Sequence, residues 1–283
     1  MSEWTIGAVL DAIADRVPDR VMTKCGERTS TFGECAERTR RLANYLAAAG
    51  LGAHRERADL QNWECGQDRV ALLMHNDLYP DMVIGALKAR TVPVNVNYNY
   101  APREVAELLA YLKPRAVIYH RSFGPKFADV LPPDTADVLI AVDDNGATPL
   151  LPGAVDLDDA LRQGDTDQPI SPSPDDVMMV CTGGTTGRPK GVMWRQADTY
   201  VVSMNGADHE SVDEIHAKLG YEGQPWFAVS PLMHAAGMWT AFAALLNGLP
   251  VVLYDNTRFD PRAVLETAER EKVGMMTMVG DAY

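Results

Sequence analysis

The sequence predicts an α/β fold with mostly parallel sheets flanked by helices, and three observations support this prediction. Short runs such as Val70–Met74 and Val138–Val142 are apolar at consecutive positions, which is typical of strands buried on both faces of a sheet. Segments with helical periodicity alternate with these runs along the chain. The length of 283 residues, with 46% hydrophobic residues, is sufficient for one large domain or two ordinary ones with a buried core.

The first half of the chain carries clear signals for the ends of its elements. Thr31 and Glu34 form the pattern of a capping box, and Gly50 is placed to end the helix that they open. Pro102 occupies the first position of a predicted helix, where proline is favourable. The elements expected here are helix Thr5–Arg16, a hairpin of Val21–Lys24 and Arg28–Thr31 around Gly26, the helix after Thr31, strand Val70–Met74, helix Pro80–Arg90, strand Val92–Val96, helix Arg103–Leu112, and strands Ala116–Tyr119 and Val138–Val142.

Residues 165–176 mark the clearest break in the pattern. Their sequence is rich in proline and aspartate and is expected to form a linker or a surface loop. We therefore predict an N-terminal α/β subdomain over 1–164 and a second, incomplete α/β subdomain over 177–283. The elements expected in the second part are strands Val177–Val180 and Val192–Trp194, a helix from about Ala197, helix Ala235–Leu246, strand Val251–Tyr254, a helix with Asp260 as N-cap and Pro261 at its first position, and strand Met275–Val279.

The charge balance restricts the classes of ligand. There are 26 Lys and Arg against 39 Asp and Glu, so the formal net charge is −13. A nucleic-acid binder needs a clustered basic face, and we therefore expect no nucleic-acid partner. An anionic ligand would have to be held by local devices, such as backbone amides and a single lysine.

The cysteines and the N-terminal segment favour a cytoplasmic protein. Four scattered cysteines include no CxxC pair, which excludes the usual zinc spacings and offers no disulfide framework. The N-terminal segment has no basic region of the kind that begins a signal peptide. No apolar run approaches the ~20 residues that would span a bilayer, so no transmembrane segment is expected.

A glycine-rich segment between two strand-like runs is the strongest functional signal. It runs from Cys181 to Gly191 with the sequence CTGGTTGRPKG. Its glycines allow successive N–H groups to turn inward and form a concavity that binds anions. Threonine hydroxyls add donors, Lys190 adds one positive charge, and a hydroxyl here can also bind the Mg²⁺ of a nucleotide triphosphate. The segment is not a Walker A loop, because Pro189 precedes Lys190 and Gly191 follows it.

This segment resembles the phosphate-binding signature of the adenylate-forming superfamily, which includes acyl-CoA synthetases, luciferases and the adenylation domains of peptide synthetases. The longer run Thr182–Arg195 is similar to a bacterial branch of fatty acyl-CoA synthetases, some of which activate branched or steroid side-chain acids. Thr31–Glu34, Asn95–Asn97 and Pro231–His234 follow in the family's order. Cys181 stands where the family more often has an aromatic residue.

The resemblance implies a two-step reaction and the residues that carry it. ATP and a carboxylic acid, fatty or steroid side-chain, would form an acyl-adenylate and pyrophosphate, after which coenzyme A would displace AMP. The implied catalytic residues are Thr185, Lys190 and His234; the implied phosphate-binding residues are Thr182, Gly183, Gly184, Thr185, Thr186, Gly187 and Lys190; His234 and Gly237 would contact the acid, and Thr185 would bind Mg²⁺.

The same resemblance implies that the chain covers about the first half of a family member, as a truncated acyl-CoA synthetase-like N-terminal domain. The family's motifs for adenine, ribose and the catalytic lysine of a mobile C-terminal domain would follow Tyr283, so we expect little or no turnover by this chain alone. Three alternatives stay open: a nucleotide- or acyl-binding half that needs a separate partner, an aryl-CoA ligase, and an adenylation domain that serves a carrier protein. A homodimer is also left open.

Overall fold

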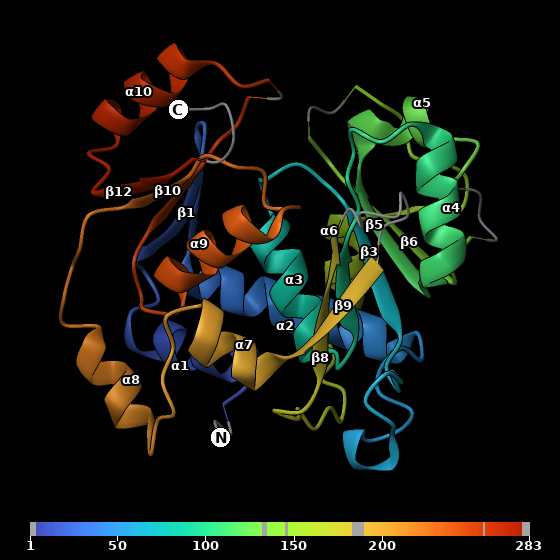
Figure 1. Ribbon diagram of the computed structural model, residues 1–283, viewed down its shortest axis with the longest axis horizontal. Helices are drawn as coiled ribbons and strands as arrows, with labels where there is room; N and C mark the ends of the chain where they lie inside the picture. The colour runs from blue at the N-terminus through green and yellow to red at the C-terminus, as the bar shows by residue number, and fades with distance from the viewer. Residues whose placement is uncertain (1–3, 132–134, 145–146, 183–189, 257, 279–283) are drawn as a thin grey trace. The chain divides into compact units, whose positions relative to one another are not determined.

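The computed structural model describes residues 4–131, 135–144, 147–182, 190–256 and 258–278 (Figure 1). The chain divides into two compact units. Unit 1 comprises Met1–Glu37, His75–Asp81 and Gln196–Tyr283, and unit 2 comprises Arg38–Met74 and Met82–Arg195. Each unit is built around its own sheet, so each is described by itself.

Unit 2 contains a seven-stranded sheet in the order β7-β6-β5-β3-β4-β8-β9. All neighbouring strands in it are parallel except β8 and β9, which are antiparallel. The strands are β3 (Arg69–Leu73), β4 (Val92–Asn95), β5 (Ala116–His120), β6 (Val138–Val142), β7 (Val155–Asp156), β8 (Val177–Thr182) and β9 (Lys190–Arg195).

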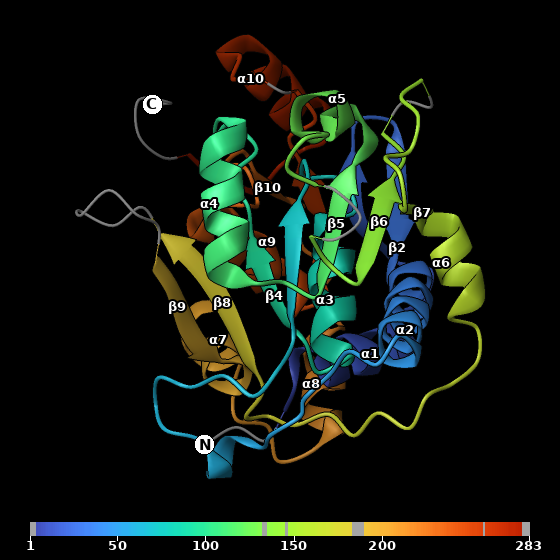
Figure 2. The same ribbon diagram turned by 90° about the vertical axis from the view of Figure 1, so that its right-hand side faces the viewer.

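Helices cover both faces of this sheet, as the apolar character of its strands requires. Figure 2 shows α4 (Pro102–Leu112) and α5 (Gly124–Phe127) in front of the sheet. Side chains of both helices join one buried cluster with β3, β4, β5 and β6. On the other face, α3 (Tyr79–Lys88) packs against α2 (Phe32–Ala48) so closely that a Cβ at Gly85 would lie 2.6 Å from a methyl of Leu42. The remaining helical segments are α6 (Leu157–Gln163) and the 3₁₀ turns Arg57–Asp59 and Arg121–Phe123.

Unit 1 contains a five-stranded sheet in the order β12-β10-β11-β1-β2, with β1 and β2 antiparallel and the other neighbours parallel. Its core includes Phe227, Val252 and Val264. The strands are β1 (Val21–Cys25), β2 (Arg28–Thr31), β10 (Trp226–Ala228), β11 (Val251–Leu253) and β12 (Met275–Thr277), and the helices are α1 (Ile6–Arg16), α7 (Gln196–Ser203), α8 (Val212–Lys218), α9 (Ala235–Leu245) and α10 (Pro261–Arg270).

The residues predicted to cap helices and to form the first turn have the predicted contacts and conformations. The backbone N–H of Thr31 donates to Glu34 at 2.8 Å, and the Glu34 N–H donates to the Thr31 hydroxyl at 3.2 Å, so the predicted capping box opens α2. Asp260 accepts from the N–H groups of the first turn of α10. Gly26 has a φ of 57° in the β1–β2 turn, a left-handed conformation that favours glycine. The predicted α/β class with mostly parallel sheets flanked by helices is confirmed.

The sequence did not predict every element. β10 lies inside the five-stranded sheet, yet its three residues follow Pro225 and are too few to show a period. The short elements β7, α5, α6 and α8 were also missed. Each of these elements is too short to show a periodic pattern in the sequence. Tertiary contacts rather than local propensity determine whether such short segments form.

The predicted division of the chain differs from the two units. Strands that precede and follow residues 165–176 belong to the same seven-stranded sheet of unit 2, and the chain returns to unit 1 at Gln196. Residues 165–176 contain no helix or strand, in agreement with a loop. The loop is nevertheless anchored, because Asp176 at its end is only 4% exposed. Division into subdomains 1–164 and 177–283 stays a prediction.

Candidate functional site

The predicted phosphate-binding segment joins the two strands of a hairpin in unit 2. Gly183, Gly184, Thr185, Thr186 and Gly187 lie outside the described residues, and the structure describes the two ends of the segment. Thr182, the last residue of β8, pairs with Lys190, the first residue of β9. Lys190 is exposed. The hairpin register therefore places the backbone positions of two predicted site residues opposite each other.

The hairpin forms because its two strands carry different patterns. β8 is apolar at successive positions and buried from Val177 to Val180, as expected for a strand inside a sheet. β9 alternates, with Lys190, Val192 and Trp194 on its exposed face, which is typical of a strand at the sheet edge. Gly191 lies against the Met179 side chain on β8, and any Cβ at this position would clash with it.

Asn95 holds the end of β8 from the neighbouring strand. Its Oδ1 accepts from the Cys181 N–H at 2.7 Å, and its Nδ2 donates to the Cys181 carbonyl at 3.3 Å. Asn95 ends β4, and parallel strands present their carboxyl ends at one edge of a sheet, where α/β proteins bind ligands. The sequence analysis quoted Asn95 in the family pattern without giving it a role; its signal is a polar residue at the end of an otherwise buried strand.

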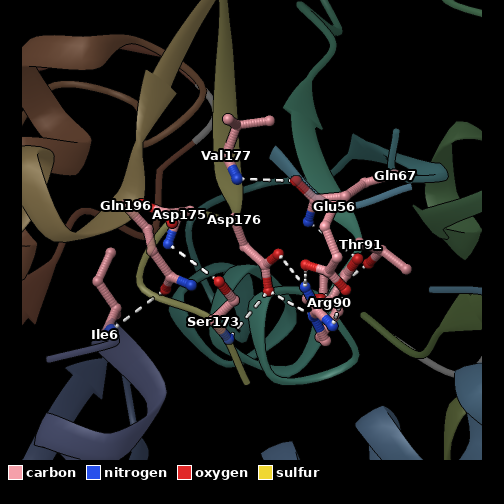
Figure 3. A network of polar contacts seen from close by, with 11 residues as sticks. Ile6, Glu56, Gln67, Arg90, Thr91, Ser173, Asp175, Asp176, Val177 and Gln196 are labelled. Carbon is pink, nitrogen blue, oxygen red and sulfur yellow. Dashed lines mark hydrogen bonds and ion pairs between the residues drawn. The ribbon is translucent and has the colours of Figure 1, made fainter. Parts of the chain in front are cut away.

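A second set of polar contacts holds the beginning of the hairpin (Figure 3). The Val177 N–H donates to Gln67 Oε1 at 2.8 Å, and Gln67 donates to the Arg90 carbonyl at 2.9 Å. The Arg90 guanidinium binds Asp176 through two hydrogen bonds of 2.9 Å and also binds Glu56 through two, of 2.9 and 2.8 Å. All of these contacts lie within unit 2, and they connect the loop before β8 to the segments around β3 and β4.

The electrostatics of this network are set by burial. Burial raises the pKa of Asp176 above its usual range, and the Arg90 guanidinium opposes that rise by hydrogen bonding and by charge. Hydrogen bonds to Glu56 and Asp176 raise the pKa of Arg90. Arg90 therefore supplies the positive charge that compensates a buried carboxylate. These residues position β8, and no local pattern indicates that Arg90 and Asp176 meet, since 86 residues separate them.

The thiol at the segment's beginning, that of Cys181, is mostly protonated at neutral pH. Burial raises the pKa of Cys181 to about 11, so the thiolate is a minor species there. The departure from the family's aromatic residue at this position thus introduces no reactive group.

His234 and Gly237 lie in unit 1, at the beginning of α9. The segment that carries them leaves the carboxyl end of β10, and His234 is the N-cap residue of α9, with φ −104° and ψ 140°. His234 is exposed, and partial desolvation of its imidazole lowers its pKa. The positive end of the helix dipole also disfavours protonation there. The imidazole is therefore neutral at neutral pH and can accept or donate a hydrogen bond.

Gly237 is required by the local packing of this turn. A Cβ at this position would lie 2.5 Å from the Ser230 carbonyl oxygen and 2.7 Å from that of Pro231. The sequence analysis assigned Gly237 to acyl-chain contact. The structure adds an independent reason for glycine, the close approach of α9 to the backbone that precedes it.

Asn76 holds the segment before His234 and was not identified from the sequence. Its Oδ1 accepts from the Leu232 N–H at 2.8 Å, and its Nδ2 donates to the Tyr254 carbonyl at 2.9 Å. Asn76 is 7% exposed, and it joins the chain after β10 to the chain after β11. Both units thus use an asparagine amide to fix the backbone beside a predicted site residue.

The described residues contain neither a metal-binding cluster nor a membrane-spanning helix. Within the described ranges, no group of three or more His, Cys, Asp and Glu side chains is arranged to hold a metal ion. Among the described helices, none has both the length and the apolar character needed to cross a membrane. Thr185, the predicted Mg²⁺ ligand, lies outside these residues.

Comparison with known proteins identifies the family. The AMP-binding enzyme family matches residues 10–283, and the chain belongs to this family. The predicted membership in the adenylate-forming superfamily is thereby confirmed. The fold is also shared with a solved structure, the inhibitor-bound N-terminal domain of FACL13 from Mycobacterium tuberculosis, with a TM-score of 0.71 and 21% identity over 98% of this chain and 63% of that chain.

Curated relatives of the chain include two acyl-CoA ligases. The chain is 39% identical over 290 residues to the medium-chain acyl-CoA ligase Mig of Mycobacterium avium, an alignment that covers 99% of this chain and 53% of the relative. It is 31% identical over 281 residues to the medium/long-chain-fatty-acid–CoA/3-oxocholest-4-en-26-oate–CoA ligase of Mycolicibacterium smegmatis, covering 95% of this chain and 48% of the relative. The chain spans about half the length of these relatives.

Proposed function

We propose that this chain provides the polyphosphate-binding and acid-binding parts of an ATP-dependent fatty or steroid side-chain acyl-CoA synthetase. One observation carries the proposal: in a member of the AMP-binding enzyme family, an edge hairpin holds both ends of a glycine- and threonine-rich segment and places Lys190 opposite Thr182. Backbone amides in such a segment can surround phosphate oxygens, and a lysine adds one compact charge.

The first chemical step explains why this segment is needed. A carboxylate oxygen attacks the α-phosphorus of ATP, the bond from that phosphorus to the bridging oxygen breaks, and pyrophosphate leaves. Because two anions must meet, catalysis depends on their positioning and on charge neutralisation. Lys190, the amides of 182–187 and the hydroxyls of Thr185 and Thr186 would hold the departing pyrophosphate. Mg²⁺ would spread its charge, with the Thr185 hydroxyl as the proposed ligand.

The second step transfers the acyl group. The sulfur of coenzyme A attacks the acyl carbon and AMP leaves with the electron pair of the broken carbon–oxygen bond.

His234 is proposed to contact the carboxylate of the acid. Its lowered pKa supports this role, because a neutral imidazole can donate a hydrogen bond to a carboxylate without forming a permanent ion pair. Gly237 would let the acyl chain lie close to the backbone of α9.

The proposed acid is suggested by the relatives. The Mycobacterium avium relative is named a medium-chain acyl-CoA ligase, and the Mycolicibacterium smegmatis relative is named for medium- and long-chain fatty acids and a steroid side-chain acid. We therefore propose a fatty or steroid side-chain acid before an aromatic one. A cytoplasmic location and a homodimer stay predictions from the sequence.

The proposal is tested by ATP–pyrophosphate exchange with the 283-residue chain and separately with any longer protein that contains it. The panel of acids comprises octanoate, palmitate, a steroid acid with its carboxylate at position 26 of the side chain, and benzoate, each with and without coenzyme A. We expect little or no exchange by the 283-residue chain alone. In the longer protein we expect exchange to depend on a fatty or steroid acid and to be lost in Lys190→Met. Exchange that depends on benzoate alone would favour the aryl-CoA ligase, and acyl transfer to a carrier protein but not to coenzyme A would favour the adenylation domain.

Binding measurements apply to the chain whatever its turnover. Isothermal titration calorimetry with MgATP and with magnesium pyrophosphate should show saturable binding by the 283-residue chain. A folded chain that binds neither compound at millimolar concentration would contradict the proposed polyphosphate site.

A further inference from the structure

The β8–β9 hairpin is joined to the rest of the unit 2 sheet by a short ladder of paired residues. β8 and β9 are in register from Val177 and Arg195 to Thr182 and Lys190. In contrast, a single register pair, Val94 with Met179, joins β4 to β8 in the described part of the chain. Position and direction of the hairpin end therefore depend on side chains as well as on the strand ladder.

Asn95 provides this support at the end nearest the phosphate-binding segment. Its amide makes both possible backbone bonds with one residue, accepting from the Cys181 N–H at 2.7 Å and donating to the Cys181 carbonyl at 3.3 Å. A primary amide presents the same donor and acceptor as a peptide group, so Asn95 replaces a ladder partner where β4 ends. Cys181 directly precedes Thr182 and pairs with Gly191, the neighbour of Lys190.

We propose that Asn95 is a positioning residue for polyphosphate binding, which fixes the carboxyl end of β8 and thereby the places of Thr182 and Lys190. The inference rests on the proposed function, because it assigns a role in a site whose ligand is a polyphosphate. Asn95 acts through the Cys181 backbone. A displacement of about 1 Å in a group that positions a reacting ligand can lower the reaction rate by a factor of ~100. A small movement of this strand end should therefore have a measurable effect on how the site holds its ligand.

The test compares Asn95→Ala with a matched control in the same unit. Asn44 is also an asparagine that clamps backbone on both sides, since its Nδ2 donates to the Gly164 carbonyl at 3.2 Å and its Oδ1 accepts from the Gln168 N–H at 3.2 Å. Asn44 fixes the beginning of the loop that follows α6, whereas β8 follows the end of that loop. Asn44→Ala therefore removes the same chemistry and leaves the Asn95–Cys181 pair intact.

Two quantities are measured on the 283-residue chain: the dissociation constant for magnesium pyrophosphate by calorimetry, and the free energy of unfolding in urea. We expect Asn95→Ala to weaken pyrophosphate binding at least about tenfold, and Asn44→Ala to stay within about twofold of the unsubstituted chain despite a similar or larger loss of stability. Binding by Asn95→Ala at the unsubstituted level, or an equal loss in Asn44→Ala, would overturn the proposal.

A second variant covers the case in which Asn95→Ala does not fold. Asn95→Asp keeps an acceptor for the Cys181 N–H but loses the donor to its carbonyl and adds a negative charge. We expect weaker pyrophosphate binding here too, and binding at the unsubstituted level would overturn the proposal. Failure of the proposed function is distinguishable, because then the unsubstituted chain itself binds no pyrophosphate.

Discussion

Two asparagines, Asn76 and Asn95, each hold the backbone through a hydrogen bond to an N–H and one to a carbonyl, but their surroundings differ. Asn76 in unit 1 is buried and joins two separate segments, through the Leu232 N–H and the Tyr254 carbonyl. Asn95 in unit 2 is half-buried, and its two hydrogen bonds go to the N–H and the carbonyl of one residue, Cys181, in the edge hairpin. The difference indicates that the segment before His234 is part of the unit 1 core, whereas the segment before Lys190 is held to its sheet at a few points.

This comparison separates two kinds of mutational effect. Substitutions that loosen the segment before His234 should mainly reduce stability, because the neighbouring residues Leu232 and Met233 are buried. Substitutions at the end of the β8–β9 hairpin should mainly reduce ligand binding, because the exposed Lys190 contributes little to the core. The predictions that follow test this separation, beginning with the largest expected effect.

Arg90→Met should cause the largest loss of stability. It leaves Asp176, whose side chain is 5% exposed, as a buried carboxylate without its compensating charge. Breaking a buried ion pair in this way costs about 3–5 kcal/mol. Urea unfolding measures the loss. Arg103→Met is the control, because its ion pair with Glu107 is exposed, at 89% and 56%, and we expect a change below about 0.5 kcal/mol.

The double variant Arg90→Met, Asp176→Leu sharpens this result. Replacing both members removes the uncompensated charge, so it should be more stable than Arg90→Met alone. A double variant that is less stable than the single one would show that Asp176 contributes through contacts other than Arg90.

Asn76→Ala should cost at least about 2 kcal/mol, because two buried backbone groups lose their partner and each unsatisfied group costs about 1–3 kcal/mol. Asn95→Ala should cost less, since Asn95 is half-buried and water can reach its surroundings. Chemical denaturation of both variants tests the comparison. Equal losses of stability, or a larger loss for Asn95→Ala, would contradict the contrast between the buried Asn76 and the half-buried Asn95.

Gly237→Ala should cost about 1–2 kcal/mol. The clash with the Ser230 and Pro231 carbonyls outweighs the gain of about 1 kcal/mol that alanine brings to a helix. Gly220→Ala is the matched control in unit 1, because a Cβ there would meet the Ala217 carbonyl only at 4.0 Å. Thermal unfolding should show destabilisation in the first variant and no loss in the second.

His234→Gln should produce the smallest effect, visible in the pH dependence of stability. The folded-state pKa of His234 is lowered, so the unfolded chain binds the proton more readily and stability falls as pH drops below about 6.5. His234→Gln should flatten this fall by less than about 1 kcal/mol, because the residue is exposed and solvent screens it. His209, whose pKa burial also lowers, is present in both chains, so their difference isolates His234. A steeper fall in the variant would contradict the sign.

The sequence was most informative where a signal is local. The capping box of Thr31 and Glu34, the N-cap at Asp260 and the apolar runs of β3 to β6 depend on neighbouring residues, and each forms as expected. The glycine-rich segment was likewise recognisable, because anion binding requires small residues at close spacing.

The contacts that position the site depend on residues far apart in the chain. Asn95 meets Cys181 and Arg90 meets Asp176 across 86 residues, and Asn76 meets Leu232 across 156. No periodicity encodes such pairs. The order of strands also places β8 beside β4, so residues 165–176 lead directly into a strand of the sheet, and their last residue, Asp176, is buried and bound to Arg90.

The central claim is that the segment between β8 and β9 binds polyphosphate with the help of Lys190. Its most direct test is the dissociation constant for magnesium pyrophosphate of Lys190→Met, compared with Lys113→Met, which removes the same charge from an exposed position in unit 2. We predict that Lys190→Met weakens binding about 10- to 100-fold, which corresponds to about 1.4–2.7 kcal/mol and is the size expected for the loss of a charged hydrogen bond, and that Lys113→Met changes it by less than about twofold. Equal binding by Lys190→Met and the unsubstituted chain would contradict the claim.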